Sequence, residues 1–248
     1  MVSPMSKIIT CTTSFNPAPL VACLPDAEGI SVHSLRDLAV RLVDEQDVHI
    51  VIVQLPMTEE LRGYLHALKT SFPRLDVVVI TENAGEKLPP GILRLDGRMD
   101  LQELCAIFRG VCGIIDREQR GKTRFDWPLK GKVSVDGDTW KTLSVRSLSA
   151  SGAFLQCEGS LAEPGTVAEL RLEFQNSILR TSCEILDARP PTGSLPRGFG
   201  VRFIGLPLPT VRSIDTMVRD ALLNALLQPG AAPAIPAIAT GGPAFGAP

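Results

Sequence analysis

The sequence predicts an α/β domain with a doubly wound parallel sheet, followed by an all-β domain that forms a small six-stranded antiparallel barrel with a C-terminal helix. Two observations support this prediction. Up to about residue 112, short apolar runs typical of strands alternate with segments of helical apolar periodicity. Between residues 131 and 204, strand-like runs instead follow one another across Gly, Pro and Asn turns, without a helical segment between them.

Five apolar runs supply the strands of the first domain. Val48 to Leu55 is an almost continuous Val/Ile run, of the kind that lies buried on both faces of a parallel sheet. The other expected strands cover residues 7–13, 30–33, 75–81 and 91–95.

Three helices are expected in the same domain. Thr58 is a good N-cap, and Glu59 and Glu60 favour the positive end of the helix dipole. Pro73 then ends that segment. The expected helices cover residues 35–45, 58–72 and 100–112.

In the second domain, Asp136-Gly137 between two apolar runs predicts a tight hairpin turn, because Gly tolerates positive φ. The expected strands cover residues 131–135, 139–147, 152–157, 167–174, 178–186 and 198–204. Residues 209–227 then form an amphipathic helix that we expect to pack on the mouth of the barrel.

Composition sets the domain boundaries. We expect a first domain over residues 1–112, a charged linker over 113–124 and the barrel with its helix over 125–227. Residues 228–248 contain 7 Ala, 5 Pro and 4 Gly and no charged residue, so they cannot bury enough apolar surface to fold and should be a disordered tail.

The charge of the chain limits its partners. With 25 Lys+Arg against 27 Asp+Glu among 248 residues, the net charge of −2 argues against binding to long nucleic acids. The first 115 residues carry 10 basic and 14 acidic residues, whereas the remainder carries 15 and 13, so a local basic site is compatible with the total. Neither an apolar run of about 20 residues nor a signal-peptide pattern occurs, and we therefore expect a cytoplasmic protein without membrane insertion.

Catalytic residues, metal ligands and cofactors are not expected. The six cysteines form no C-x-x-C pair, and only three histidines are available to complete a metal site. A Gly-rich turn after the first strand, a nucleophile elbow and paired catalytic carboxylates are all missing, which makes an α/β enzyme a weak alternative. Gly121-Lys122-Thr123 lacks the Gly that a phosphate-binding loop has five residues earlier.

Residues 6 to 112 resemble a response-regulator receiver domain by the order of their elements. The third strand ends in Gln54, where that family carries its phospho-accepting Asp. Cys11 to Ser14 replace the acidic residues that hold magnesium, while Thr81 matches the family's hydroxyl at the end of the fourth strand. Because Gln is not a nucleophile, the resemblance implies a degenerate receiver that is not phosphorylated and serves as a docking surface for an unidentified protein or as a structural partner.

Two short motifs flank the predicted hairpin. Arg120 and Arg124 form an R-x-x-x-R pair in the linker, which by itself is most simply a solvated charge run. Ser149 and Gly152 follow the hairpin, and a Gly-rich strand begins at Gly198. At these residues the segment from about 117 to 227 resembles a PilZ domain.

The PilZ resemblance implies a six-stranded barrel whose R-x-x-x-R and [D/N]-x-S-x-x-G motifs bind the bacterial second messenger cyclic di-GMP. It places Arg120, Arg124, Ser147, Ser149 and Gly152 at the ligand. Ser147 departs from the pattern, which has Asp or Asn there.

The chemistry of the motifs fits such a ligand. Arginine can bond a phosphate or a guanine edge in a bidentate manner and can stack on a purine, so two arginines four residues apart can hold an anionic, aromatic ligand. Ser149 offers a small donor and acceptor, and Gly152 allows close backbone approach or positive φ. Ser147 is a shorter and weaker acceptor than Asp, so we expect reduced affinity. An ordinary Ser- and Gly-rich β-turn is the alternative interpretation.

Two functional hypotheses follow. The first is a non-enzymatic cyclic di-GMP effector, in which the ligand folds the linker over the barrel and reorients the receiver-like domain toward a protein partner. Motility or biofilm control is the context that the resemblance implies. The second is a ligand-independent adaptor that acts only through protein–protein interactions.

Overall fold

The computed structural model describes residues 6–13, 16–24, 27–45, 48–72, 75–83, 85, 87–112, 129–158, 163–189, 196–229 and 245–246 of the chain. The chain divides into two compact units. The first consists of Met1–Gly121 with Leu223–Ala231, and the second of Lys122–Leu222 with Ala232–Pro248.

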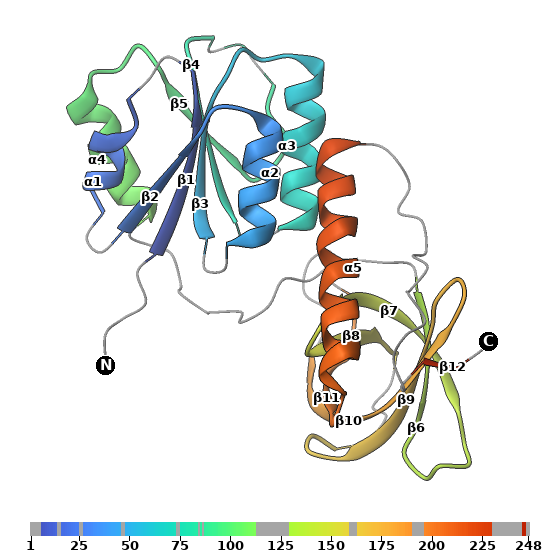
Figure 1. The fold of residues 1–248 in the computed structure, drawn as a ribbon. Coiled ribbons are helices and arrows are strands. Elements are labelled where there is room, and N and C mark those ends of the chain that lie inside the picture. The colour runs from blue at the N-terminus through green and yellow to red at the C-terminus, as the bar shows by residue number, and fades with distance from the viewer. Residues whose placement is uncertain are drawn as a thin grey trace. The chain divides into compact units, whose positions relative to one another are not determined.

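The first unit is a five-stranded parallel sheet in the order β2-β1-β3-β4-β5, with helices on both faces (Figure 1). This confirms the predicted doubly wound sheet. Its elements are β1 (Ser6–Thr12), α1 (Ala18–Ala22), β2 (Ala27–Val32), α2 (Leu35–Asp44), β3 (Val48–Gln54), α3 (Glu59–Ser71), β4 (Asp76–Thr81), β5 (Ile92–Asp96) and α4 (Leu101–Cys112).

Alternate residues of the central strands enter two separate cores, because successive side chains of a strand point to opposite faces. Val51 and Val53 of β3 pack with side chains of α2 and α3, including the fully buried Leu65. Ile50 and Ile52 pack on the other face, against α1 and α4. The Val/Ile run of β3 is therefore buried on both sides, as the sequence predicts.

One helix of this unit was not predicted. Helix α1 is only five residues long, follows Pro17 and buries only Leu20 fully, so its sequence shows no apolar periodicity. Between β4 and β5 the described residues contain no helix, in agreement with the obstacle that Pro89-Pro90 presents. The specific resemblance of the unit to a receiver stays a prediction.

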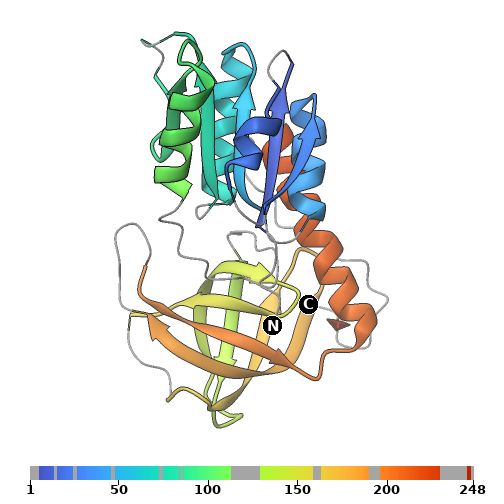
Figure 2. The ribbon, with the colours of Figure 1, turned by 90° about the vertical axis from the view of Figure 1, so that its left-hand side faces the viewer.

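The second unit is a closed antiparallel barrel (Figure 2). Six strands follow the order β11-β8-β7-β6-β9-β10, and pairing of β10 with β11 closes the ring, which confirms the predicted barrel. The strands are β6 (Leu129–Ser134), β7 (Lys141–Ser149), β8 (Gly152–Gln156), β9 (Val167–Glu173), β10 (Ile178–Arg189) and β11 (Gly198–Ile204).

The β6–β7 hairpin is closed by the carboxylate of Asp136. Its Oδ1 accepts hydrogen bonds from the backbone N–H of Thr139 at 2.7 Å and of Asp138 at 3.0 Å, and from the Ser134 hydroxyl at 3.0 Å. These hydrogen bonds, above all those from Thr139, hold the pKa of the Asp136 carboxyl well below its usual range. Gly137 has φ +83°, the positive value that the Asp-Gly pair predicts.

Helix α5 (Leu208–Leu227) contributes to both units. Ile214, Val218 and Leu222 are buried on one side of the helix and belong to the second unit. Leu226 is also fully buried, but it lies in the first unit, in the same core as the α2 and α3 side chains, with Leu223 packed against that core. The expectation that the whole helix packs on the barrel therefore does not hold for its last turn.

Of the predicted tail 228–248, the structure describes Gln228, Pro229 and the short strand β12 (Phe245–Gly246). Strand β12 pairs antiparallel with Ile178 and Leu179 of β10, which the composition did not predict. The other tail residues lie outside the described residues. Among the helices of the described ranges, none is long and apolar enough to cross a bilayer.

Candidate functional site

Three of the five predicted ligand-binding residues lie together at the turn between β7 and β8. Ser149 ends β7 and pairs with Gly152 at the start of β8, and Ser147 pairs with Phe154 in the same hairpin. Arg120 and Arg124 lie outside the described residues. The structure therefore brings together Ser147, Ser149 and Gly152 and leaves the position of the two arginines as a prediction.

The Ser149 hydroxyl holds the turn itself. The residue is completely buried, and its Oγ donates to the Gly152 carbonyl at 3.1 Å and lies 3.2 Å from the Ser151 Oγ. The Ser151 carbonyl accepts from the Phe203 N–H of β11 at 3.0 Å. In this arrangement Ser149 shapes the turn from inside, and contact with a ligand requires the turn to open.

Gly152 is required by the neighbouring strand. A Cβ at this position would lie 2.1 Å from the Val201 carbonyl oxygen of β11, a distance that no side chain can adopt. Gly152 does not have a positive φ. Of the two predicted reasons for this glycine, positive φ is therefore wrong, and close approach to a ligand stays a prediction. In this structure the close approach is that of β11.

Ser147 is the most accessible of the three residues. It is half-buried and follows a bulge in β7, where the register shifts between Val145 and Ser147. The bulged residue Arg146 is exposed, and its Nε donates to Gln156 Oε1 at 2.6 Å. Bulges redirect side chains at the edge of a strand. The position where the chain departs from the expected motif is therefore also the one most open to solvent.

Arg202 is a neighbour of the turn that the sequence analysis missed. It lies on β11 directly opposite Gly152, is exposed, and forms an ion pair with Glu184 of β10. The pairing of β8 with β11 joins residues about fifty positions apart in the sequence, which no local pattern reveals. Its guanidinium is a cation beside the turn, whereas Arg146 is bonded to Gln156 at the opposite end of β8.

Cys11 and Gln54 lie near the carboxyl ends of β1 and β3, at the positions compared above with the acidic residues of a receiver. Cys11 is fully buried, and burial raises the pKa of its thiol to about 11, so it is not a nucleophile near neutral pH. Gln54 Oε1 is buried and accepts no hydrogen bond from the described part of the chain. Within the described ranges, no three His, Cys, Asp or Glu side chains group as metal ligands.

The sequence profile of the PilZ domain matches residues 117–220. Residues 117–220 form a PilZ domain. The matched segment contains both predicted motifs, from Arg120 to Gly152, together with all six strands of the barrel and most of α5.

Several solved structures are similar to part of this chain. The inhibitor of motility MotI/DgrA of Bacillus subtilis shares 13% identity with a TM-score of 0.39, covering 43% of this chain and 52% of its own. YcgR of Escherichia coli, in complex with c-di-GMP, shares 12% identity with a TM-score of 0.37, covering 43% and 46%. The chain thus spans about half the length of these two proteins. Comparison with curated proteins gives no match.

Proposed function

We propose that the protein is a non-enzymatic effector that binds cyclic di-GMP through its PilZ domain. The observation that carries this proposal is the PilZ match over residues 117–220, because that segment contains both motifs by which the family binds the ligand. The hairpin geometry supports it, since Ser147 and Gly152 lie at one turn of the barrel. The exposed Arg202 opposite Gly152 places a cation beside that turn, and its ion pair with Glu184 offsets part of this charge.

In the proposed complex, Arg120 and Arg124 bind the phosphates and guanines, and the half-buried Ser147 accepts a hydrogen bond from a guanine N–H. A serine hydroxyl offers one oxygen where Asp offers a charged pair of oxygens, so the complex is weaker than one formed by the complete motif. The ligand therefore acts at concentrations above those that saturate a PilZ domain with Asp at this position.

The regulatory step is a change of orientation. Binding brings residues 113–124 onto the barrel and shifts the first unit to an arrangement in which a protein partner gains or loses access to it. A ligand shifts such an equilibrium only by its differential affinity for the two arrangements.

Isothermal titration calorimetry with cyclic di-GMP tests the proposal. The wild type should show saturable binding, and Arg120→Ala and Arg124→Ala should each weaken it at least about tenfold, because each removes a charge-assisted contact. Arg212→Ala, which removes an exposed arginine of α5, is the matched control and should bind like the wild type. Saturable binding that survives both linker substitutions contradicts the assigned site.

A ligand-independent adaptor is the second candidate. Ser147 in place of Asp or Asn and the complete burial of Ser149 favour it. The adaptor predicts no heat of binding at high micromolar cyclic di-GMP from a folded protein, together with capture of the same protein partner in the presence and absence of ligand. Ligand-dependent capture contradicts it.

A further inference from the structure

The outer face of the barrel carries three cations in one cross-strand row. Lys132 of β6 pairs with Arg171 of β9, and Arg171 pairs with Arg180 of β10. Each cation is next to a buried residue of its own strand, as Arg171 is between Leu170 and Leu172. The side chains of the three cations therefore point away from the barrel core. Like charges directly opposite one another destabilise a sheet. The row is therefore an arrangement that folding alone does not favour.

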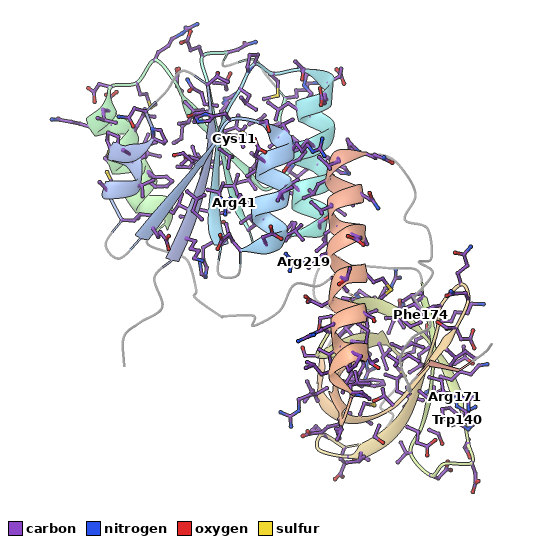
Figure 3. The ribbon with its side chains drawn as sticks, viewed as in Figure 1. Cys11, Arg41, Trp140, Arg171, Phe174 and Arg219 are labelled. Atoms are coloured by element: carbon purple, nitrogen blue, oxygen red, sulfur yellow. The ribbon has the colours of Figure 1, made fainter. Side chains whose placement is uncertain are left out.

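Two of the three cations have partners. Lys132 forms an ion pair with Glu173 at 2.9 Å, and the Arg171 guanidinium lies 3.8 Å from the ring centroid of Trp140, which Figure 3 shows beside it. This cation–π contact fixes the guanidinium plane. Arg180 is exposed and makes no ion pair within the described part of the chain.

These two arginines line a cavity of about 480 Å³, which we call the Trp140–Arg180 cavity. Its volume is within the range of about 300–1,000 Å³ typical of small-molecule sites. Thr181 and Ser182 of β10 add hydroxyl groups to one side, and residues 204–207, including Leu206 and Pro207, form an apolar wall. The cavity thus combines two guanidinium groups, two hydroxyls and an apolar surface.

One carboxylate limits the charge that the cavity can accept. Glu169 also lines it, two residues before Arg171 on β9 and opposite Ser182. With two arginines against one glutamate, the lining retains a net positive charge that suits one anionic group. A polyanion would place further negative charge near Glu169, which the lining does not balance.

We propose that the Trp140–Arg180 cavity binds a nucleoside monophosphate, with its phosphate on the guanidinium groups of Arg171 and Arg180. Arginine's planar fork matches phosphate oxygens in a bidentate manner. The base lies against the apolar wall that Leu206 and Pro207 help to form. This attraction of both guanidinium groups to one anion accounts for the cross-strand pair of like charges.

The two arginines that hold the phosphate in this proposal are not part of the turn proposed for cyclic di-GMP. The arginines of the cavity are distant from the turn, because in the closed strand order β9 lies three strands from β8 in either direction around the barrel. The apolar wall is nearer, since it begins at Ile204, two residues after the Arg202 that pairs with Gly152. Arg171 is on β9, whereas Gly152 begins β8. The inference therefore goes beyond the proposed function and does not depend on it.

The test uses the full chain with Arg120→Ala, Arg124→Ala and Trp127→Phe. The first two substitutions disable the proposed cyclic di-GMP site, and the third leaves Trp140 as the single tryptophan, since the chain has two. Titration with adenosine and guanosine monophosphates should change the Trp140 fluorescence and saturate below millimolar concentration. Failure of both nucleotides to bind overturns the proposal, whatever cyclic di-GMP does with the wild type.

Arg180→Gln in this background should weaken binding at least about tenfold, because it removes a charge-assisted hydrogen-bonding group. Arg180 is exposed, so the substitution should leave the fold intact, which circular dichroism checks. Lys130→Gln, which removes an exposed cation of β6 that does not line the cavity, is the matched control and should change affinity less than about twofold. Equal losses in the two variants contradict a specific site.

Inorganic phosphate and adenosine separate the two parts of the proposed site. Each should bind at least about tenfold more weakly than adenosine monophosphate, because each lacks one of the two sets of contacts. Phosphate that binds as tightly as the nucleotide refutes the contribution of the apolar wall. Adenosine that binds as tightly refutes the contribution of the arginines.

Discussion

Ser147 decides how strongly the barrel turn can hold a guanine. We predict that Ser147→Asp raises the affinity for cyclic di-GMP roughly tenfold, because a carboxylate can accept from both N–H groups of a guanine edge, a pairing worth about 1–3 kcal/mol. The half-buried Ser147 leaves room for the substitution at the surface. Calorimetric titration of the variant and the wild type measures the change.

Ser144→Asp is the control for this prediction. Ser144 is exposed on the same strand, so the substitution adds the same charge away from the turn and should leave the affinity unchanged or slightly lower. If neither the wild type nor Ser147→Asp binds cyclic di-GMP, the pocket has lost its function, as the adaptor hypothesis requires.

Gly152 is expected to matter for stability before it matters for ligand binding. We predict that Gly152→Ala destabilises the barrel by at least about 2 kcal/mol, because a Cβ 2.1 Å from the Val201 oxygen forces β8 and β11 apart. Urea unfolding followed by tryptophan fluorescence in the Trp127→Phe background, where Trp140 is the single tryptophan, measures the change. Gly200→Ala is the matched control, since its Cβ meets Leu186 only at 3.5 Å, an ordinary contact. Equal stability of the two variants contradicts the close approach.

At the scale of single residues, the sequence predicted positions better than roles. The motif located Ser147, Ser149 and Gly152 at one turn, and the structure agrees. The motif does not indicate that the Ser149 side chain is buried and bonded within the turn. The contact of Gly152 with β11 also could not be predicted, because it depends on a strand that is distant in the sequence. Arg171 and Arg180 escaped notice for the same reason, since only the β9–β10 register places them side by side.

The β6–β7 hairpin gives the barrel a pH-dependent element. The pKa of the Asp136 carboxyl is lowered in the folded state by the hydrogen bonds from Thr139, Asp138 and Ser134, whereas an unfolded Asp titrates near about 3.9. A lowered folded pKa contributes stability that is complete above the unfolded pKa and is lost as the pH falls through the folded pKa. We predict that the urea midpoint of the barrel falls as the pH decreases from about 5 to 2.

Asp136→Asn tests this assignment. The variant should reduce the urea midpoint near neutral pH and make it less dependent on pH below about 5, because its amide does not titrate. Asp138→Asn is the matched control, since the carboxylate of Asp138 accepts none of the hydrogen bonds that close the turn. A pH dependence that persists in Asp136→Asn but disappears in Asp138→Asn contradicts the role of Asp136.

Elements with a decisive apolar pattern were predictable, and those without one were not. The Val/Ile run of β3 and the Asp-Gly turn of the hairpin identify their structures through burial and backbone conformation. Helix α1 and strand β12 are short and are formed through packing and pairing with distant residues. Local periodicity cannot predict such elements.

At the scale of the whole molecule, each of the two units is built from two separate segments of the chain. Helix α5 begins in the second unit and ends in the first, where Leu226 is fully buried in the core formed with α2 and α3. The predicted barrel domain extends to residue 227 and so assigns the last turn of α5 to the barrel. Amphipathic periodicity indicates which residues of a helix are buried, but it does not indicate which core they enter.

We predict that two substitutions in this one helix destabilise different units. Leu226→Ala should destabilise the first unit and Ile214→Ala the second, each by about 2–5 kcal/mol, because each leaves a cavity at a completely buried site. Hydrogen exchange of the full chain, resolved by peptide, measures where protection is lost. Leu227→Ala is the matched control, since Leu227 is exposed and should cause little change in either unit. If both core substitutions deprotected the same peptides, α5 would serve a single core, and the assignment of its last turn to the first unit would be wrong.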